Sequence, residues 1–186
     1  MPLNVPNLVT LSRIVLIPLL IGIYYLPISE EVKNITATVI FIFAGITDWL
    51  DGYLARRLNQ MSAFGAFLDP VADKLIVVAA LLALLYLKRV DMIVALIIVG
   101  REIAISALRE WMAKVGQSAS VGVAFVGKLK TVAQMVAIPL LLFHDELLGL
   151  DCQWAGTILI NVAAVLTAAS MLYYLRKALP YASVRG

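Results

Sequence analysis

Long apolar stretches follow one another along this chain and set the strongest limit on its fold. A helix needs about 20 mostly apolar residues to cross the roughly 30 Å hydrocarbon core of a bilayer. Six stretches of this kind occur in the 186 residues, separated by short polar links. They span residues 7–26, 34–56, 67–87, 91–113, 129–147 and 154–175. We therefore predict an all-α, polytopic membrane protein with six transmembrane helices in a single domain, residues 1–186.

The overall composition excludes several other classes of protein. Hydrophobic residues make up 62% of the chain and charged residues 15%, which leaves no room for a large extramembrane domain. The net charge of +3 is too small to predict nucleic-acid binding. The single cysteine, Cys152, excludes an intrachain disulfide and a CxxC metal site, and the single histidine, His144, is expected in a solvated loop. The N-terminal sequence predicts no cleavable signal peptide.

Lysine and arginine residues near the short links predict how the helices are oriented. An even number of spans puts both termini on one side, and that side would carry nine cations against three on the other. The nine are Arg56, Arg57, Arg109, Lys114, Lys128, Lys130, Arg176, Lys177 and Arg185. Because positive residues in short loops mark the cytoplasmic side, we expect both termini in the cytoplasm.

Charged residues also occur inside the expected helices, and this orientation places them in the inner half of the membrane. Asp48 and Asp51 fall in the last turns of the second helix, whereas Asp69 and Asp73 fall in the first turns of the third. A charge at bilayer depth costs at least about 2.5–3.5 kcal/mol, so such residues face a partner or a wet cavity. The inner half is therefore the expected functional region.

The four aspartates predict a site for divalent cations. Residues three or four apart share a helix face, so Asp48 lies beside Asp51 and Asp69 beside Asp73. Carboxylates gathered in this way repel one another at low dielectric unless a cation holds them together. Mg²⁺ is commonly bound through a few carboxylates plus substrate phosphates, and Mn²⁺ accepts the same oxygen ligands. Two such ions would clamp the attacking and leaving oxygens of a phosphoryl displacement.

Small and basic residues surround the aspartates. Gly52 and Ala55 lie on one helix face, where they would let a bulky ligand approach the backbone or would serve helix packing. Arg56 suits a phosphate group. We expect Gly65 in the loop between the second and third helices, and Pro70 in the first turn of the third, where its missing N–H breaks no hydrogen bond.

These residues form one pattern with fixed spacing. It reads Asp48-x₂-Asp51-Gly52-x₂-Ala55-Arg56-x₈-Gly65-x₃-Asp69-x₃-Asp73. The eight residues match, position for position, the signature of the CDP-alcohol phosphatidyltransferase family, and the chain is identified as a member by this resemblance. The segments NVPNLVTLSR, GREIAISALREWM and GKLKTVAQM resemble the members of that family that use glycerol 3-phosphate.

The resemblance implies a fold, cofactors and roles for the signature residues. The fold would have six helices, usually in a homodimer, with a polar cavity open to the cytoplasm of a bacterial inner membrane. Four aspartates would hold two Mg²⁺ ions, with Mn²⁺ as the alternative, namely Asp48, Asp51, Asp69 and Asp73. Asp73 would also be the general base. The CDP group would be bound by Asn7, Thr10, Gly52, Ala55, Arg56 and Gly65.

The implied reaction belongs to phospholipid biosynthesis, on the route to phosphatidylglycerol. The 1-hydroxyl of sn-glycerol 3-phosphate attacks the lipid-bearing phosphorus of CDP-diacylglycerol, and CMP leaves. Because this acceptor carries its own phosphate, it needs cations, and the candidates are Arg101, Arg109, Lys128 and Lys130. Each could instead be an ordinary cation of the cytoplasmic side, although Arg101 lies too deep for that explanation. Glu102 is expected to pair with a cation, and Lys74 to balance the acidic cluster.

Three other interpretations remain open at this point. The same chemistry could use another acceptor, such as serine, inositol phosphate, an aminoalcohol or phosphatidylglycerol, and inositol phosphate would also need the basic residues. A transporter with the aspartates on a cation path would need matching polar groups in the outer half, which the sequence lacks. A structural membrane protein with a charge-paired helix seam would have no need of the eight-residue signature.

Overall fold

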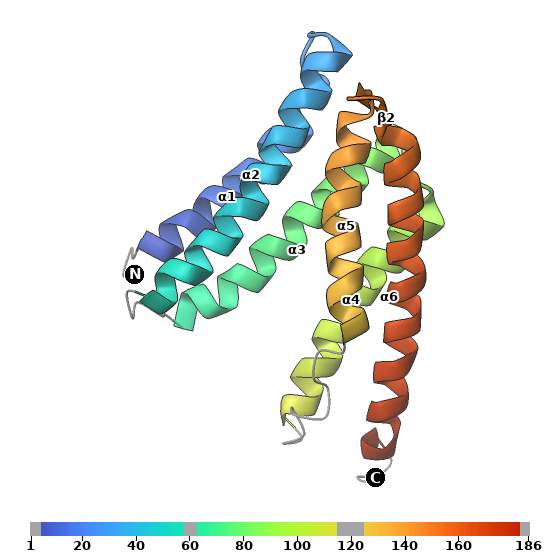
Figure 1. Ribbon diagram of the computed structural model, residues 1–186. Coiled ribbons are helices and arrows are strands. Elements are labelled where there is room, and N and C mark those ends of the chain that lie inside the picture. The colour runs from blue at the N-terminus through green and yellow to red at the C-terminus, as the bar shows by residue number, and fades with distance from the viewer. Residues whose placement is uncertain (1–4, 58–62, 115–124, 183–186) are drawn as a thin grey trace.

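Six helices make up nearly all of the computed structural model, which describes residues 5–57, 63–114 and 125–182 (Figure 1). They are α1 (Val5–Gly22), α2 (Glu30–Arg57), α3 (Ala63–Tyr86), α4 (Met92–Lys114), α5 (Phe125–Phe143) and α6 (Cys152–Ala182). A single 3₁₀ turn, η1 (Ile23–Tyr25), follows α1. Two short antiparallel strands, β1 (Glu146–Leu147) and β2 (Leu150–Asp151), join α5 to α6. The all-α prediction is therefore confirmed, apart from this minimal hairpin.

Two helix ends differ from the predicted ranges. Helix α3 begins at Ala63, so Gly65 lies in its first turn rather than in a loop, and Pro70 lies inside the helix. Both expectations were wrong, because the helical segment 63–69 continues upstream of the proline and Gly65 is buried there. Helix α5 ends at Phe143, four residues before the predicted end at 147, because His144 adopts the left-handed conformation with φ 70°. His144 lies in a link, as predicted, but it is half-buried.

Buried apolar side chains from all six helices form the main core. The largest of them are Leu20, Phe41, Leu81, Leu84, Ile98, Ile138, Leu141, Leu142 and Ile160. Helices α5 and α6 pack closely, because a Cβ added at Gly156 would come within 2.7 Å of Leu141 Cγ. A small residue at such a contact lets the backbones of the two helices come close together. Close packing of this kind drives helix association in membranes.

Large apolar side chains also cover the outside of the molecule. Val15, Phe43, Leu96 and Val165 are each more than half exposed, at 59%, 52%, 69% and 69%. Among the described residues, one helical segment is long and apolar enough to cross a membrane, Cys152–Leu179, with a mean hydropathy of 1.9. Shorter apolar helical segments span Thr10–Tyr25 and Leu129–Phe143. The apolar exterior fits a lipid environment, and six membrane crossings remain a prediction.

Arg89, in the link between α3 and α4, ties three parts of the fold together. Its guanidinium donates to the carbonyl oxygens of Leu141 and Leu142 at the end of α5, at 3.2 and 2.9 Å. It also donates to Asn34 Oδ1 near the start of α2, at 2.9 Å. A cation at a helix C-terminus is favourable because it meets otherwise unpaired carbonyls. We call this arrangement the Arg89 clasp.

Candidate active site

All six helices contribute side chains to one cavity of about 440 Å³. Its charged lining residues are Arg13, Asp48, Asp73, Lys74, Arg101, Glu102, Arg109 and Lys130. Residues separated by more than a hundred positions therefore meet in one place, which the sequence predicted from the depth of their charges. The aspartates of the lining come from α2 and α3, whereas Glu102 and most of the basic residues come from α4 and α5.

Arg13 of α1 forms ion pairs with two aspartates on the acidic side of the cavity. Its side chain is fully buried, and its NH1 atom lies 3.1 Å from Asp48 Oδ1. The same atom contacts Asp73 Oδ1. Because Asp48 comes from α2 and Asp73 from α3, the two predicted metal ligands face each other across one positive group. In the sequence, Arg13 is a charge within the apolar stretch 7–26, and this position is the signal by which it could be found.

Asp69 has a different partner on α1. The hydroxyl of Thr10 donates to Asp69 Oδ1 at 2.5 Å, and Thr10 itself is fully buried. The sequence assigned Thr10 to the CDP group, whereas in this structure it contacts a predicted metal ligand. Gly65, also assigned to the CDP group, is buried in the first turn of α3.

Several predicted residues lie outside the side chains that the structure describes. They are Asn7, Asp51, Gly52, Ala55, Arg56 and Lys128, although their backbones belong to α1, α2 and α5. Among the described side chains, no three acidic, histidine or cysteine residues gather closely enough to hold a metal ion by themselves. The residues still fit a divalent cation, because Asp48 and Asp73 supply hard oxygen ligands and already share one positive group.

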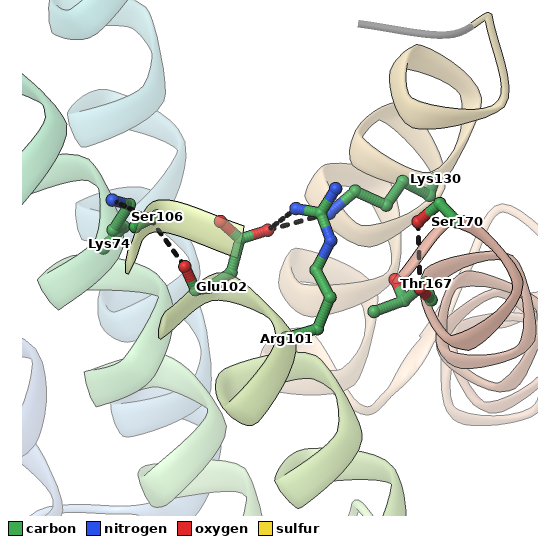
Figure 2. A network of polar contacts seen from close by, with 7 residues as sticks. All are labelled: Lys74, Arg101, Glu102, Ser106, Lys130, Thr167 and Ser170. Atoms are coloured by element: carbon green, nitrogen blue, oxygen red, sulfur yellow. Dashed lines mark hydrogen bonds and ion pairs between the residues drawn. The ribbon is translucent and has the colours of Figure 1, made fainter. Parts of the chain in front are cut away.

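The basic side of the cavity is a buried cluster on α4 and α5 (Figure 2). Arg101 is 6% exposed and Lys130 is 2% exposed. Arg101 NH1 and Lys130 Nζ each lie 2.8 Å from the same atom, Glu102 Oε1. Arg109 lines the same cavity but is exposed. The structure therefore brings three of the four predicted phosphate ligands together, and Lys128 lies outside the described side chains.

Lys74 links the two sides of the cavity. It follows Asp73 on α3, and its Nζ donates to Ser106 Oγ of α4 at 2.5 Å. Ser106 Oγ in turn donates to the backbone carbonyl of Glu102 at 2.6 Å (Figure 2). Lys74 was expected only to balance the aspartates, and the structure adds a contact toward the basic cluster. Ser106 carried no signal in the sequence, because nothing there distinguishes it from a packing residue.

Comparison with known proteins gives the family. The sequence model of the CDP-alcohol phosphatidyltransferases matches residues 3–172. The chain belongs to this family. This confirms the resemblance drawn from the eight-residue signature, and it makes the chain an enzyme, which leaves no support for the transporter and structural interpretations. CDP-alcohol phosphatidyltransferases generally depend on divalent metal ions, which agrees with the carboxylate ligands of the cavity.

Curated relatives within the family are similar over nearly their whole length. A CDP-diacylglycerol–glycerol-3-phosphate 3-phosphatidyltransferase of Salmonella choleraesuis is 48% identical over 180 residues, covering 96% of both chains. Proteins of the same name from Escherichia coli K12 and Shigella sonnei are 47% identical with the same coverage. Among CDP-alcohol phosphatidyltransferases, this chain is therefore similar to enzymes whose name specifies both the lipid donor and the phosphorylated acceptor.

Proposed function

We propose that this chain transfers the phosphatidyl group of CDP-diacylglycerol to sn-glycerol 3-phosphate, giving phosphatidylglycerophosphate and CMP. The observation that carries the proposal is one cavity with carboxylates on one side and buried cations on the other. The first set suits a nucleotide pyrophosphate with its metal ions, and the second suits a phosphorylated acceptor. Relatives named for this reaction, at 47–48% identity over 96% of the chain, support the same choice of substrates.

The donor lies at the acidic side in this proposal. Two Mg²⁺ ions, or Mn²⁺ ions, would be held by Asp48, Asp51, Asp69 and Asp73. Bound there, the ions offset negative charge on the pyrophosphate and on the departing CMP. The CDP group is assigned to Asn7, Thr10, Gly52, Ala55, Arg56 and Gly65. Support for this placement comes from the family signature and from the proximity of Asp48 to Asp73 through Arg13.

Asp73 is the proposed general base. It lines the cavity on α3, next to Lys74, whose contact with Ser106 leads toward the basic cluster. A base must lie within hydrogen-bond reach of the proton that it removes. In this arrangement the Asp73 carboxylate takes the proton of the acceptor's 1-hydroxyl, the oxygen bonds to the lipid-bearing phosphorus, and the bond from that phosphorus to the CMP oxygen breaks.

The acceptor's phosphate lies at the basic side. Arg101 and Lys130 are almost fully buried, and the buried Arg101 Nε has no hydrogen-bond partner among the residues that the structure describes. Buried charges and donors of this kind are costly without a partner, and phosphate oxygens would supply one. Arg109 and Lys128 complete the proposed set of phosphate ligands. Arg101 suits this role because its planar donors match phosphate geometry.

An apolar groove beside the cavity is the proposed seat of an acyl chain. A second hollow of about 310 Å³ is lined by Phe41, Ile42, Gly45, Ile46 and Met135. Phe41, Gly45 and Met135 line the main cavity too, so the two spaces adjoin. The groove therefore offers a route from the polar reaction centre to the apolar exterior, as a lipid with a charged head requires.

The proposed location is a bacterial inner membrane, with six transmembrane helices and with both termini and the cavity on the cytoplasmic side. The exposed apolar side chains on every helix support this placement. The first residues of α1 and the last residues of α6 lie toward the same end of the molecule (Figure 1). This arrangement supports the proposal that both termini are on one side of the membrane. Assembly into a homodimer is proposed from the family resemblance.

The reaction is tested by CMP release from the purified protein in detergent micelles that contain CDP-diacylglycerol and Mg²⁺. Glycerol 3-phosphate, serine, inositol phosphate and phosphatidylglycerol are offered one at a time as acceptors. Release with glycerol 3-phosphate alone is the expected result. Release with a different acceptor would keep the aspartate chemistry but overturn the assignment of the basic cluster.

A further inference from the structure

We propose that Glu102 is a positioning residue of the acceptor site, which holds Arg101 and Lys130 in the arrangement that receives the acceptor's phosphate. This inference rests on the proposed function and adds a residue to it. One carboxylate oxygen, Glu102 Oε1, accepts hydrogen bonds from Arg101 NH1 and Lys130 Nζ, each at 2.8 Å. Glu102 itself lines the cavity.

Two buried cations need a shared anion in order to stay side by side. Arg101 and Lys130 are 6% and 2% exposed, so little water reaches them. Unpaired, each would carry a large desolvation cost, and together they would repel each other. With Glu102 between them the group has a net charge of +1, which is two cations minus one carboxylate. The cluster can therefore persist without substrate and still attract an anion.

Glu102 uses only part of what the two cations can donate. Arg101 gives NH1 to Glu102, whereas its Nε is buried and has no partner within the described part of the chain. A lysine ammonium has three N–H donors, and Lys130 gives one of them to Glu102. The donors that remain come from two helices and are held at one place, because both cations are anchored to the same oxygen. Phosphate is a chemically matched ligand for such a set.

The backbone of Glu102 is fixed from a third helix. Ser106 Oγ donates to the Glu102 carbonyl at 2.6 Å, and Lys74 of α3 donates to Ser106 at 2.5 Å. Figure 2 shows Glu102 between the Lys74–Ser106 pair on one side and Arg101 with Lys130 on the other. Lys74, which is next to the proposed base, is thus connected through Ser106 and Glu102 with the proposed phosphate ligands. Glu102 is the residue that lies between the two groups.

A positioning role and a purely structural role predict different kinetics. A carboxylate that only ties α4 to α5 would, when removed, lower stability and reduce kcat whichever substrate is varied. A carboxylate that orders the phosphate ligands would, when removed, raise KM for glycerol 3-phosphate and leave kcat and KM for CDP-diacylglycerol near their original values.

The test compares Glu102→Gln with Glu110→Gln in the CMP-release assay, with direct titration of glycerol 3-phosphate binding alongside. Glu110 is a matched control because it lies on the same helix in an exposed ion pair with Lys114, with side chains 70% and 73% exposed. Glu102→Gln should raise KM and Kd for glycerol 3-phosphate about tenfold or more, the loss expected for hydrogen bonds to charged groups. Glu102→Asp should recover part of that loss, and Glu110→Gln should change nothing.

Other results would overturn the inference. An unchanged KM for glycerol 3-phosphate would show that Glu102 does not position the phosphate ligands. A lower KM would show that its carboxylate competes with the phosphate for Arg101 and Lys130. A fall in kcat with an unchanged KM would assign it a structural role. If Glu102→Gln does not fold, Glu102→Asp is judged by the same two KM values. Wild-type protein that releases no CMP with glycerol 3-phosphate would instead overturn the proposed function, and this inference with it.

Discussion

At the scale of single residues, the site combines side chains that the sequence could name with side chains that only the fold could place. Asp48, Asp73 and Arg101 were predictable, because a charge deep in an apolar run is costly in free energy and therefore marks a functional site. Their partners were not predictable in the same way. Arg13 bridges carboxylates 35 and 60 positions away, and no local pattern encodes a contact across that separation. Glu102 was expected to pair with a cation, but its sharing of one oxygen between two cations depends on the fold, which brings the Lys130 side chain of α5 to Glu102 of α4.

Asp73→Asn tests the general base. The amide keeps the size of the carboxylate but cannot accept the hydroxyl proton, so kcat should fall by about 100-fold or more, whereas binding of CDP-diacylglycerol should persist in part. Single-turnover CMP release and equilibrium binding of the nucleotide lipid measure the two effects. Asp145→Asn, in the exposed link after α5, is the control. A near-normal kcat would remove Asp73 from this role.

Arg101→Ala tests the phosphate subsite. Loss of the guanidinium should raise KM for glycerol 3-phosphate about tenfold or more, because charge-assisted hydrogen bonds to phosphate are lost. KM for CDP-diacylglycerol should stay within about twofold, because Arg101 lies on the opposite side of the cavity from the aspartates. If donor binding weakens and acceptor binding does not, Arg101 belongs to the nucleotide side instead.

At the scale of helices, apolar runs predicted every helix, but they predicted the ends less well. An apolar run says where a helix can lie, whereas its end depends on backbone conformation. Helix α5 stops where His144 adopts the left-handed conformation, although the span predicted from hydropathy reached residue 147. Gly65 and Pro70 resembled loop and first-turn residues, but α3 begins at Ala63 and Gly65 is buried in its first turn. Sequence-based boundaries therefore failed where tertiary packing decides the outcome.

Gly156→Ala tests the close contact of α5 with α6. The new Cβ would meet Leu141 Cγ at 2.7 Å and the Ala137 carbonyl oxygen at 3.2 Å, so the helices must separate. Overpacking of this kind costs about 1–3 kcal/mol of unfolding free energy. Gly22→Ala is the control, because nothing lies within 4 Å of its added Cβ. Denaturation in detergent should show lower stability for the first variant alone, and equal stabilities would contradict the packing argument.

Gly45→Leu tests the acyl-chain groove between α2 and α5. A Cβ at this position would already lie 3.3 Å from Met135 Cε, so a larger side chain should close the junction between cavity and groove. KM for CDP-diacylglycerol should rise severalfold, and less so for a donor with short acyl chains, while KM for glycerol 3-phosphate stays constant. Val39→Leu, exposed on the same helix, serves as the comparison. Equal effects on long and short chains would reject the groove.

At the scale of the whole molecule, the sequence predicted an arrangement in a membrane that labelling can test. In a Cys152→Ser background, Leu148→Cys and Lys114→Cys each supply one exposed thiol, since Leu148 is 100% exposed in the hairpin and Lys114 ends α4. A membrane-impermeant maleimide should label Leu148→Cys in intact cells and Lys114→Cys only after the membrane is opened. Labelling of Lys114→Cys in intact cells would reverse the proposed orientation.

The participation of every helix in one cavity has a consequence for the order in which the protein is made. Arg13 comes from the first helix and Tyr174 from the last, and both line the same space. A nascent chain that has inserted α1 to α3 already carries the aspartates, yet the wall that would hold the acceptor arrives only with α4 and α5, and α6 closes it. A chain interrupted before its last helix would lack Tyr174 and with it part of the cavity wall, so the complete lining forms only when all six helices have been made.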